Sequence, residues 1–572
     1  MRHTERRRFA LGALLVGLLC GVAIAAAGEE LYNGIQLPTI WPPRDGDPKS
    51  TEPMTVPYLQ NPPKIIPINI GRQLFVDDFL IEQTDLTRVF HQAQKFAGNP
   101  VLTPTETDGE GRQKSCAMIA GGVFYDPAER AFKMFYDAGG LHGGLYGALA
   151  LATSTDLIHW RRPNVGLAGT NWLLPKSRNF NLQDGAGRDR CLWLDLNTEQ
   201  LEERIKYMAG GFDAVPGDPL DGKHLMHLLK TSSDGRAWSR PVRTGPAEDY
   251  STFFYNPFRK VWVFSIKGPH GFPCRDRCRY YAENRDFLAG ADWGKAMVYW
   301  TNADRLDEPD PAIGEAAQLY CLNAVAYESL LLGEFQIHLG PKNEVCDAEK
   351  SPKITELKLG FSRDGFHWQR PDRCPFIAAT RKAGDWDRGY IHGAVGVCVV
   401  LGDKLYFPYC GFSGFAPDGA RGMYYGGSIG MATLRRDGFA SMDAGAKPGT
   451  LTTRPVVFDG KKLFVNLAAP QGELRVEILD EQKQVIAPFS VANCTPITAD
   501  KTLLAVEWKG TADLSALAGK PVKFRFQLTN GKLYAFWVSP DQSGASRGYV
   551  AAGGPGFSGT LDGGGALTRQ TP

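Results

Sequence analysis

One segment of this chain returns later in almost the same form, and this repeat limits what the chain can fold into. FYDPAERAFKMFY, which begins at Phe124, matches FYNPFRKVWVFSI, which begins at Phe254, an offset of 130 residues (254 minus 124). Both copies contain a short aromatic run, a turn that opens with Asp-Pro or Asn-Pro, and a second run rich in large apolar residues. This order is typical of two antiparallel strands joined by a turn. The sequence therefore predicts a β-hairpin that is used repeatedly.

A second motif marks the ends of these units. STDLIHWRRP at Ser154 resembles SSDGRAWSRP at Ser232 and SRDGFHWQRP at Ser362, and weaker copies surround Asp286 and Asp437. The gaps between the five Asp positions run from 52 to 78 residues, about the length of four short strands. Repeats of this kind are the signature of a β-propeller. We therefore expect an all-β chain that contains a five-bladed β-propeller.

The recurring Asp and Trp of this motif have a structural interpretation. We expect the Asp to cap a turn and the Trp to fill the gap between neighbouring blades. Asp156, Asp234 and Asp364 are therefore not catalytic candidates.

With 572 residues the chain is too long for one domain. We predict a Pro-rich linker or strap over residues 28–71, the propeller over 72–446, and a C-terminal β-sandwich over 447–541, where short alternating strands follow one another. Residues 542–572 are rich in Gly, Ser and Ala and predict a disordered tail.

Residues 1–27 predict an export signal. A basic Arg6-Arg7-Arg8 precedes an apolar run and the small residues Ala25-Ala26-Ala27, and it also resembles a twin-arginine signal. We expect a mature protein that begins near Gly28, in the periplasm or outside the cell. The alternatives are an uncleaved anchor and a lipoprotein attached through Cys20. No later apolar run is long enough to span a bilayer.

Charge and cysteine content exclude several classes of partner. Without residues 1–27, which hold four Arg and one Glu, the chain has 60 basic and 61 acidic residues. Nothing in this balance indicates nucleic acid or an anionic membrane. Cys274 and Cys278 lie in CRDRC, but a zinc site needs a second pair nearby. We expect a local disulfide or two free thiols, and neither a metal nor another cofactor.

Three carboxylates are predicted near the central axis. Asp189 precedes Trp193 by four residues, and Asp249 precedes Phe254 by five. The second and third blades should begin at these two places. Glu328 lies in the expected first strand of the fourth blade. Acids at such places are also typical of solvated turns. The next pair to consider is Asp77 and Asp78, for which solvated charges on a ring-closing strand are the alternative.

Other residues near the expected channel mouth are candidates for sugar binding. Tyr327 precedes Glu328, and Arg388 and His392 lie in DRGYIHG at the entrance to the fifth blade. Surface or inter-blade hydrogen bonding is the alternative role for Arg388 and His392.

The pattern resembles the five-bladed propeller superfamily of glycoside hydrolases that contains families 32 and 43, over roughly residues 72–440. The resemblance lies in NPVL at Asn99, in the repeated hairpin and in the S-x-D-G-x-x-W-x-R-P ends, and the added sandwich resembles family 32. It implies a base role for Asp189, an orienting role for Asp249 and an acid role for Glu328. The first repeat lacks a WMNDPNG-like motif, and the chain lacks Arg-Asp-Pro and Glu-Cys-Pro.

The sequence thus predicts an exported glycoside hydrolase that acts on a glycoside, oligosaccharide or polysaccharide. One carboxyl would protonate the leaving oxygen, and another would activate water or attack the sugar. Two alternatives stay open. One is a non-catalytic propeller that binds glycans or proteins, and the other is a glycoside phosphorylase with one acid and a basic phosphate pocket. The sugar, the linkage and the oligomeric state are not defined.

Overall fold

The computed structural model describes residues 28–104, 115–139, 145–178, 188–212, 225–269, 271–294, 296–415, 419 and 421–564. The predicted export signal therefore lies outside the described residues. Within them, strands dominate, and the α-helices are short: α1 (Pro57–Gln60) and α2 (Asn343–Glu349). No helix in this part of the chain is long and apolar enough to cross a membrane. The all-β prediction is confirmed.

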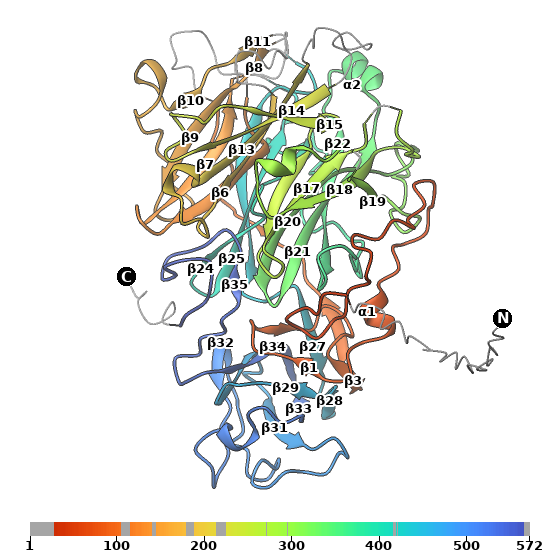
Figure 1. Ribbon diagram of the computed structural model, residues 1–572, viewed down its shortest axis with the longest axis vertical. Coiled ribbons are helices and arrows are strands. Elements are labelled where there is room, and N and C mark those ends of the chain that lie inside the picture. The colour runs from red at the N-terminus through yellow and green to blue at the C-terminus, as the bar shows by residue number, and fades with distance from the viewer. Residues whose placement is uncertain are drawn as a thin grey trace, which may run out of the picture.

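Five antiparallel sheets form the upper lobe in Figure 1, and each is built mainly from strands that lie close together in the sequence. The first sheet contains β6 (Cys116–Asp126), β7 (Ala131–Ala138), β9 (Ala148–Ser154) and β10 (Trp172–Leu174); the second, β12 (Arg188–Leu194), β13 (Ile205–Phe212), β14 (Leu225–Ser232) and β15 (Val242–Pro246); the third, β16 (Thr252–Asn256), β17 (Val261–Lys267), β18 (Cys278–Asn284) and β19 (Val298–Asn302); the fourth, β20 (Gln318–Glu328), β21 (Leu330–Gly340) and β22 (Ile354–Ser362); the fifth, β23 (Gly389–Gly393), β24 (Val399–Leu401), β25 (Lys404–Phe412) and β26 (Gly427–Arg435).

The first strands of these sheets follow one another in a closed circle. β6 contacts β12, β12 contacts β16, and β16 contacts β20, while β23 contacts both the fourth sheet and β6. A bridge between Gly122 and Val395 joins the first and fifth sheets directly. The fifth sheet takes its outermost strand, β5 (Gln94–Lys95), from a distant part of the chain. The inner edges therefore face one another instead of presenting unpaired backbone to solvent.

The repeated hairpins have the predicted geometry. Asp126 and Asn256 occupy the same place in their turns, and each side-chain oxygen accepts a hydrogen bond from the backbone NH two residues later, at 3.0 and 3.1 Å. Asp156, Asp234 and Asp364 cap their turns in the same way, as expected.

The Trp residues of the same motif behave differently from one another. Trp368 packs between two sheets against Trp300, with ring centroids 6.1 Å apart, as predicted. Trp238 instead packs on Tyr207 of its own sheet.

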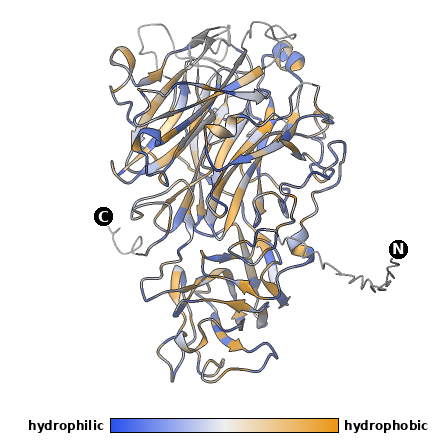
Figure 2. Cartoon of the chain, viewed as in Figure 1, coloured by the Kyte–Doolittle hydropathy of each residue, from blue (hydrophilic) through white to orange (hydrophobic). Residues whose placement is uncertain are grey.

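Two further sheets form the smaller lower lobe in Figure 1. They face a common hydrophobic core that is separate from the core of the upper lobe. Figure 2 shows hydrophobic residues along the strands of both lobes and hydrophilic residues mainly on the connections. One lower sheet contains β2 (Gln73–Leu74), β4 (Thr87–Phe90), β27 (Ala440–Ala444), β30 (Lys462–Ala468), β32 (Asp500–Ala505) and β34 (Gly531–Ser539); the other contains β3 (Ile81–Thr84), β28 (Gly449–Thr453), β31 (Glu473–Leu479) and β33 (Lys523–Thr529).

Two predicted boundaries are wrong. Residues 73–90, assigned to the propeller, supply strands to the lower lobe, because their alternating apolar side chains complete its core. The tail from 542 was predicted as disordered, yet β35 (Tyr549–Val550) pairs with β20. Its few apolar residues, such as Val550 and Phe557, are buried, so low hydrophobicity did not prevent order.

The N-terminal segment 28–71 runs over both lobes as a strap. Its apolar residues Leu31 and Ile68 join the lower core, and β1 (Ile66–Pro67) pairs in parallel with β29 (Val456–Val457). Of the two alternatives for the CRDRC motif, the structure has the disulfide, between Cys274 and Cys278.

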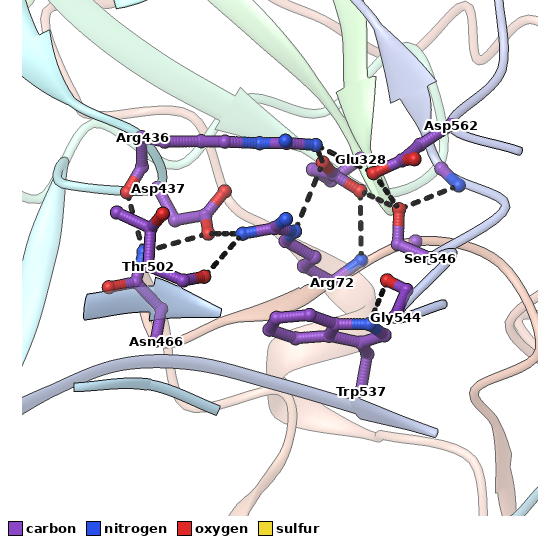
Figure 3. A network of polar contacts seen from close by, with 12 residues as sticks. Arg72, Glu328, Arg436, Asp437, Asn466, Thr502, Trp537, Gly544, Ser546 and Asp562 are labelled. Carbon is purple, nitrogen blue, oxygen red and sulfur yellow. Dashed lines mark hydrogen bonds and ion pairs between the residues drawn. The ribbon is translucent and has the colours of Figure 1, made fainter. Parts of the chain in front are cut away.

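A buried network of charges joins the lobes (Figure 3). Arg72 of the lower lobe donates to Asp437 at 2.9 Å, and its Nε lies 3.5 Å from Glu328 of the fourth sheet. Arg436, which follows the fifth sheet, donates to Glu328 at 3.0 Å and to Asp562 at 2.7 Å. All of these side chains are at most 5% exposed. Each charge is satisfied only when the lobes and the C-terminal segment are docked.

The Arg72 guanidinium is also held from its other side. It lies 4.2 Å from the Trp537 ring centre, and the Trp537 indole donates to the carbonyl of Gly544 at 3.0 Å. A cation over an aromatic ring in a dry site is stabilised by the ring's negative face.

Glu328→Gln should therefore destabilise the protein. Loss of the carboxylate leaves two buried guanidiniums short of a counter-charge, which costs about 3–5 kcal/mol. Denaturant unfolding should show a lower midpoint than in wild type. Asp78→Asn is the control, because the Asp78 side chain is 72% exposed and its ion pair is with the surface residue Arg88. An unchanged midpoint in Glu328→Gln would contradict this role for the network.

Candidate active site

The inner strands of the upper lobe begin at the end farther from the lower lobe, near α2 at the top of Figure 1. Their starts are irregular. Asp189, Tyr250 and Tyr390 have left-handed backbones, with φ of 49°, 57° and 50°. The pairing register shifts near the starts of β6, β12, β20 and β23. Strained residues and bulges re-aim side chains and gather at functional sites. We call this region the mouth.

On one side of the mouth lie two carboxylates, Asp137 at the end of β7 and Asp189 in β12. Arg190 donates to Asp137 Oδ1 at 2.9 Å and also to the carbonyl of Gly147. Burial raises the pKa of Asp137 to about 6, against the opposing effect of Arg190, and the charge of Asp189 adds to the rise. Asp137 is 7% exposed and Asp189 is half-buried. The Asp137 carboxyl therefore keeps its proton up to about pH 6.

Asp249 lies at the mouth on the third sheet, just before β16. It forms an ion pair with Lys267, and its side chain is 38% exposed. The following residue, Tyr250, is buried and begins the aromatic part of the site.

Three tyrosines from three sheets form an aromatic wall. The Tyr320 and Tyr390 hydroxyls lie 2.9 Å apart. His392 Nδ1 lies 3.0 Å from the Tyr250 hydroxyl and 3.2 Å from Gln336 Nε2. Burial lowers the pKa of His392 to about 3, so its ring is neutral at physiological pH.

The buried guanidinium of Arg279 fixes two of these tyrosines. It donates to the carbonyl of Tyr250 at 2.8 Å and to the carbonyl of Tyr320. The wall is thus held by backbone contacts as well as by the tyrosine hydroxyls.

The structure brings several predicted residues to this end of the ring and excludes two. Asp189 lies at the start of β12 and Asp249 just before β16, as expected, and His392 lies within the short strand β23. Arg388 is half-buried just before β23, and its guanidinium lies beside Gly414.

Glu328 and Tyr327 were predicted as general acid and sugar-binding residue, and both assignments are wrong. They end β20, at the opposite end of the strand from Tyr320, where the chain turns at Ser329 into β21. Glu328 is fully buried among arginines, and the Tyr327 hydroxyl donates to Asp437 at 2.6 Å. Glu-Ser between two apolar runs is typical of a hairpin turn, and this signal in the sequence could have placed Glu328 at the end of its strand.

Asp77 and Asp78 are not an active-site pair either. Asp77 accepts from Arg363 at 2.8 Å and is buried against the lower lobe, and Asp78 points to solvent beside Arg88.

The sequence analysis also missed Asp137 and Glu334. Each is an acid inside an otherwise apolar strand, in KMFYDA and LLLGEFQIHLG, and that is the signal that could have found them. Glu334 is 1% exposed and packs against the backbone of Gly393, where a side chain would overlap its carboxyl group. Its Oε2 has no hydrogen-bond partner within the described residues. Burial raises the pKa of Glu334 to about 8, partly offset by Asn323.

The described residues contain no group of three or more His, Cys, Asp or Glu that could hold a metal ion.

Glu334→Gln should change how stability depends on pH. The folded protein keeps the Glu334 proton up to about pH 8, whereas the unfolded chain releases it near 4.5. Wild type should therefore lose stability relative to the variant as pH rises from 4.5 to 8, by at most about 5 kcal/mol. Above pH 8 the difference should stay constant.

Denaturant unfolding across this pH range measures the effect, with Glu308→Gln on an exposed loop as the matched control. Parallel curves for wild type and Glu334→Gln would show that Glu334 is ionised when folded.

Comparison with known proteins gives fold-level neighbours only. No family model and no curated protein matches the chain. The similar solved structures include an N-acetylgalactosamine deacetylase from F. plautii (15% identity, TM-score 0.41, covering 61% of this chain and 96% of that one). They also include a thermostable family-43 glycoside hydrolase (11%, 0.38, 57% and 92%) and an exo-beta-1,3-galactanase from Phanerochaete chrysosporium (10%, 0.33, 78% and 99%). Glycoside hydrolases are thus among its structural neighbours, at similarities too low to argue a reaction.

Proposed function

We propose that the upper lobe is a five-bladed β-propeller, that the lower lobe is a β-sandwich, and that the protein is an exported glycosidase working in the mouth. The closed order of five sheets and the two sheets around one core support the architecture. The observation that supports this function most strongly is the pair Asp137 and Asp189, two neighbouring carboxyls in unlike environments.

Such a pair suits glycoside cleavage. Asp137, whose proton is retained to about pH 6, would give that proton to the leaving glycosidic oxygen. Asp189, nearer to solvent, would act as the ionised partner that activates water or attacks the anomeric carbon. Asp249 would orient the sugar through its hydroxyls, and the tyrosine wall would stack on the sugar ring.

Arg190 has a positioning role in this scheme. Its guanidinium holds Asp137 at 2.9 Å and would stabilise the carboxylate left after proton transfer. A non-catalytic glycan-binding propeller needs a shaped aromatic mouth but no buried acid with a raised pKa. The phosphorylase alternative is favoured by one observation, the cations that surround Tyr320.

Asp137→Asn and Asp189→Asn should each lower turnover by roughly 10²–10⁴-fold, the usual contribution of general acid or base catalysis. The purified mature protein is first screened on glycosides and polysaccharides, and kcat is then measured on the best substrate. Asp78→Asn provides the matched control and should keep wild-type turnover. Near-normal turnover in both mouth variants would exclude this pair.

The pH dependence should reveal the proton on Asp137. Only the protonated carboxyl can act as the acid, so kcat/KM should fall about tenfold per pH unit above pH 6. Substrates with good leaving groups need less protonation and should show a weaker fall. A profile that stays flat to pH 8 on a poor-leaving-group substrate would rule out Asp137 as proton donor.

A further inference from the structure

The side of the mouth opposite Asp137 carries a group of cations around one tyrosine. Arg277 and Lys353 lie 5.2 and 5.3 Å from the centre of the Tyr320 ring. Lys353 Nζ is also 5.4 Å from the Tyr390 ring centre and 3.4 Å from the Tyr320 hydroxyl. Lys353 is only 2% exposed, so its ammonium is held largely out of solvent. Lys267 lies close enough to add its charge. We call Lys267, Arg277 and Lys353 the cationic corner.

The cationic corner is short of negative charge. Within the described residues, no carboxylate lies close enough to Lys353 or Arg277 to form an ion pair, for which the limit is 4.0 Å. Asp249, whose charge acts on Lys353, already pairs with Lys267. Burial lowers the pKa of Lys353 to about 8, and the charge of Arg277 lowers it further, against smaller opposing effects of Cys346 and Asp249. Holding like charges together in a buried place is unfavourable unless an anion joins them.

The surrounding backbone fixes this arrangement. The backbone NH of Tyr390 donates to the carbonyl of Lys353 at 2.6 Å, which ties the fourth sheet to the start of the fifth. Arg277 donates to the side chain of Gln318 at the start of β20. The cations are therefore placed by the same strand starts that place the tyrosines.

A second polar side chain, whose ring nitrogens form no hydrogen bond within the described residues, lies beside these cations. His338 stacks on Tyr320, with ring centroids 5.5 Å apart, and is 3% exposed. Neither of its ring nitrogens has a hydrogen-bond partner within the described residues. Burial lowers the pKa of His338 to about 3, so the neutral ring can donate one hydrogen bond. A ligand with acceptor oxygens would satisfy this donor together with the two cations.

We propose that the cationic corner binds an oxyanion next to the sugar, either a carboxylate or sulfate carried by the substrate or a free phosphate ion. The inference deepens the proposed function, because it assigns an anionic partner to the same mouth. The tyrosine wall is adjacent, with the Tyr320 and Tyr390 ring centres 5.3 and 5.4 Å from Lys353 Nζ, which favours an anion that is attached to a sugar. Neutral glycosides would leave the cations uncompensated.

Binding measurements test this without requiring turnover. Isothermal titration of the full mature protein, at constant ionic strength, compares glucuronate with glucose, galacturonate with galactose, and sodium sulfate and phosphate with chloride. We expect at least one uronate to bind tenfold or more tightly than its neutral counterpart. Lys353→Met should abolish that preference.

Two further variants keep the experiment decisive. Lys382→Met replaces an exposed lysine and should leave the preference unchanged. Arg277→Gln changes a half-buried cation and should weaken anion binding even if Lys353→Met folds poorly, which thermal unfolding of each variant checks. Asp137→Asn should bind anions like wild type, so a failure of the catalytic proposal is distinguishable from a failure of this one.

The pattern of ligands identifies the source of the anion. Tight phosphate binding with no uronate or sulfate preference would assign the corner to a free phosphate ion, and a uronate or sulfate preference would assign it to the sugar. Equal, weak binding of all anions by wild type and Lys353→Met would overturn the proposal.

Discussion

The relative placement of the two lobes depends on one buried set of ion pairs. Arg72, Glu328, the adjacent Arg436 and Asp437, and Asp562 come from four distant parts of the chain, and none has enough counter-charge without the others. Burying charges is unfavourable by several kcal/mol per ion unless each is paired and hydrogen-bonded. A misdocked lower lobe would leave guanidiniums unpaired, so the network favours one arrangement of the lobes and orders the C-terminal segment with it.

With the base of the ring fixed in this way, irregular backbone can be tolerated at the opposite end. Asp189, Tyr250 and Tyr390 adopt left-handed conformations at the starts of three inner strands. Such conformations cost of order 1–3 kcal/mol each and persist where the surroundings hold them. Here the closed circle of strands and the Arg279 hydrogen bonds do so. The result is a site whose carboxyls, tyrosines and cations are placed before any ligand arrives.

The two sides of the mouth differ in charge. Asp137 and Asp189 lie on the first and second sheets, whereas Arg277 and Lys353 directly precede β18 of the third sheet and β22 of the fourth. This separation limits neutralisation of one group by the other and suits a substrate with its reacting bond at one side and an anion at the other. In the proposed function, the same ring would therefore combine acid–base chemistry with selection for an anionic substrate.

The sequence alone determined the repeating hairpin, the capping role of Asp156, Asp234 and Asp364, and the all-β class, because these follow from local turn chemistry and strand periodicity. It also placed Asp189 and Asp249 at strand starts. Only the tertiary structure decided which acids lie in an environment that suits proton transfer. Glu328 and Asp137 look alike in sequence, as acids in apolar strands, but their environments depend on residues far away in the chain. Two arginines from distant segments surround Glu328, whereas burial beside Asp189 and a single arginine leaves Asp137 able to hold a proton.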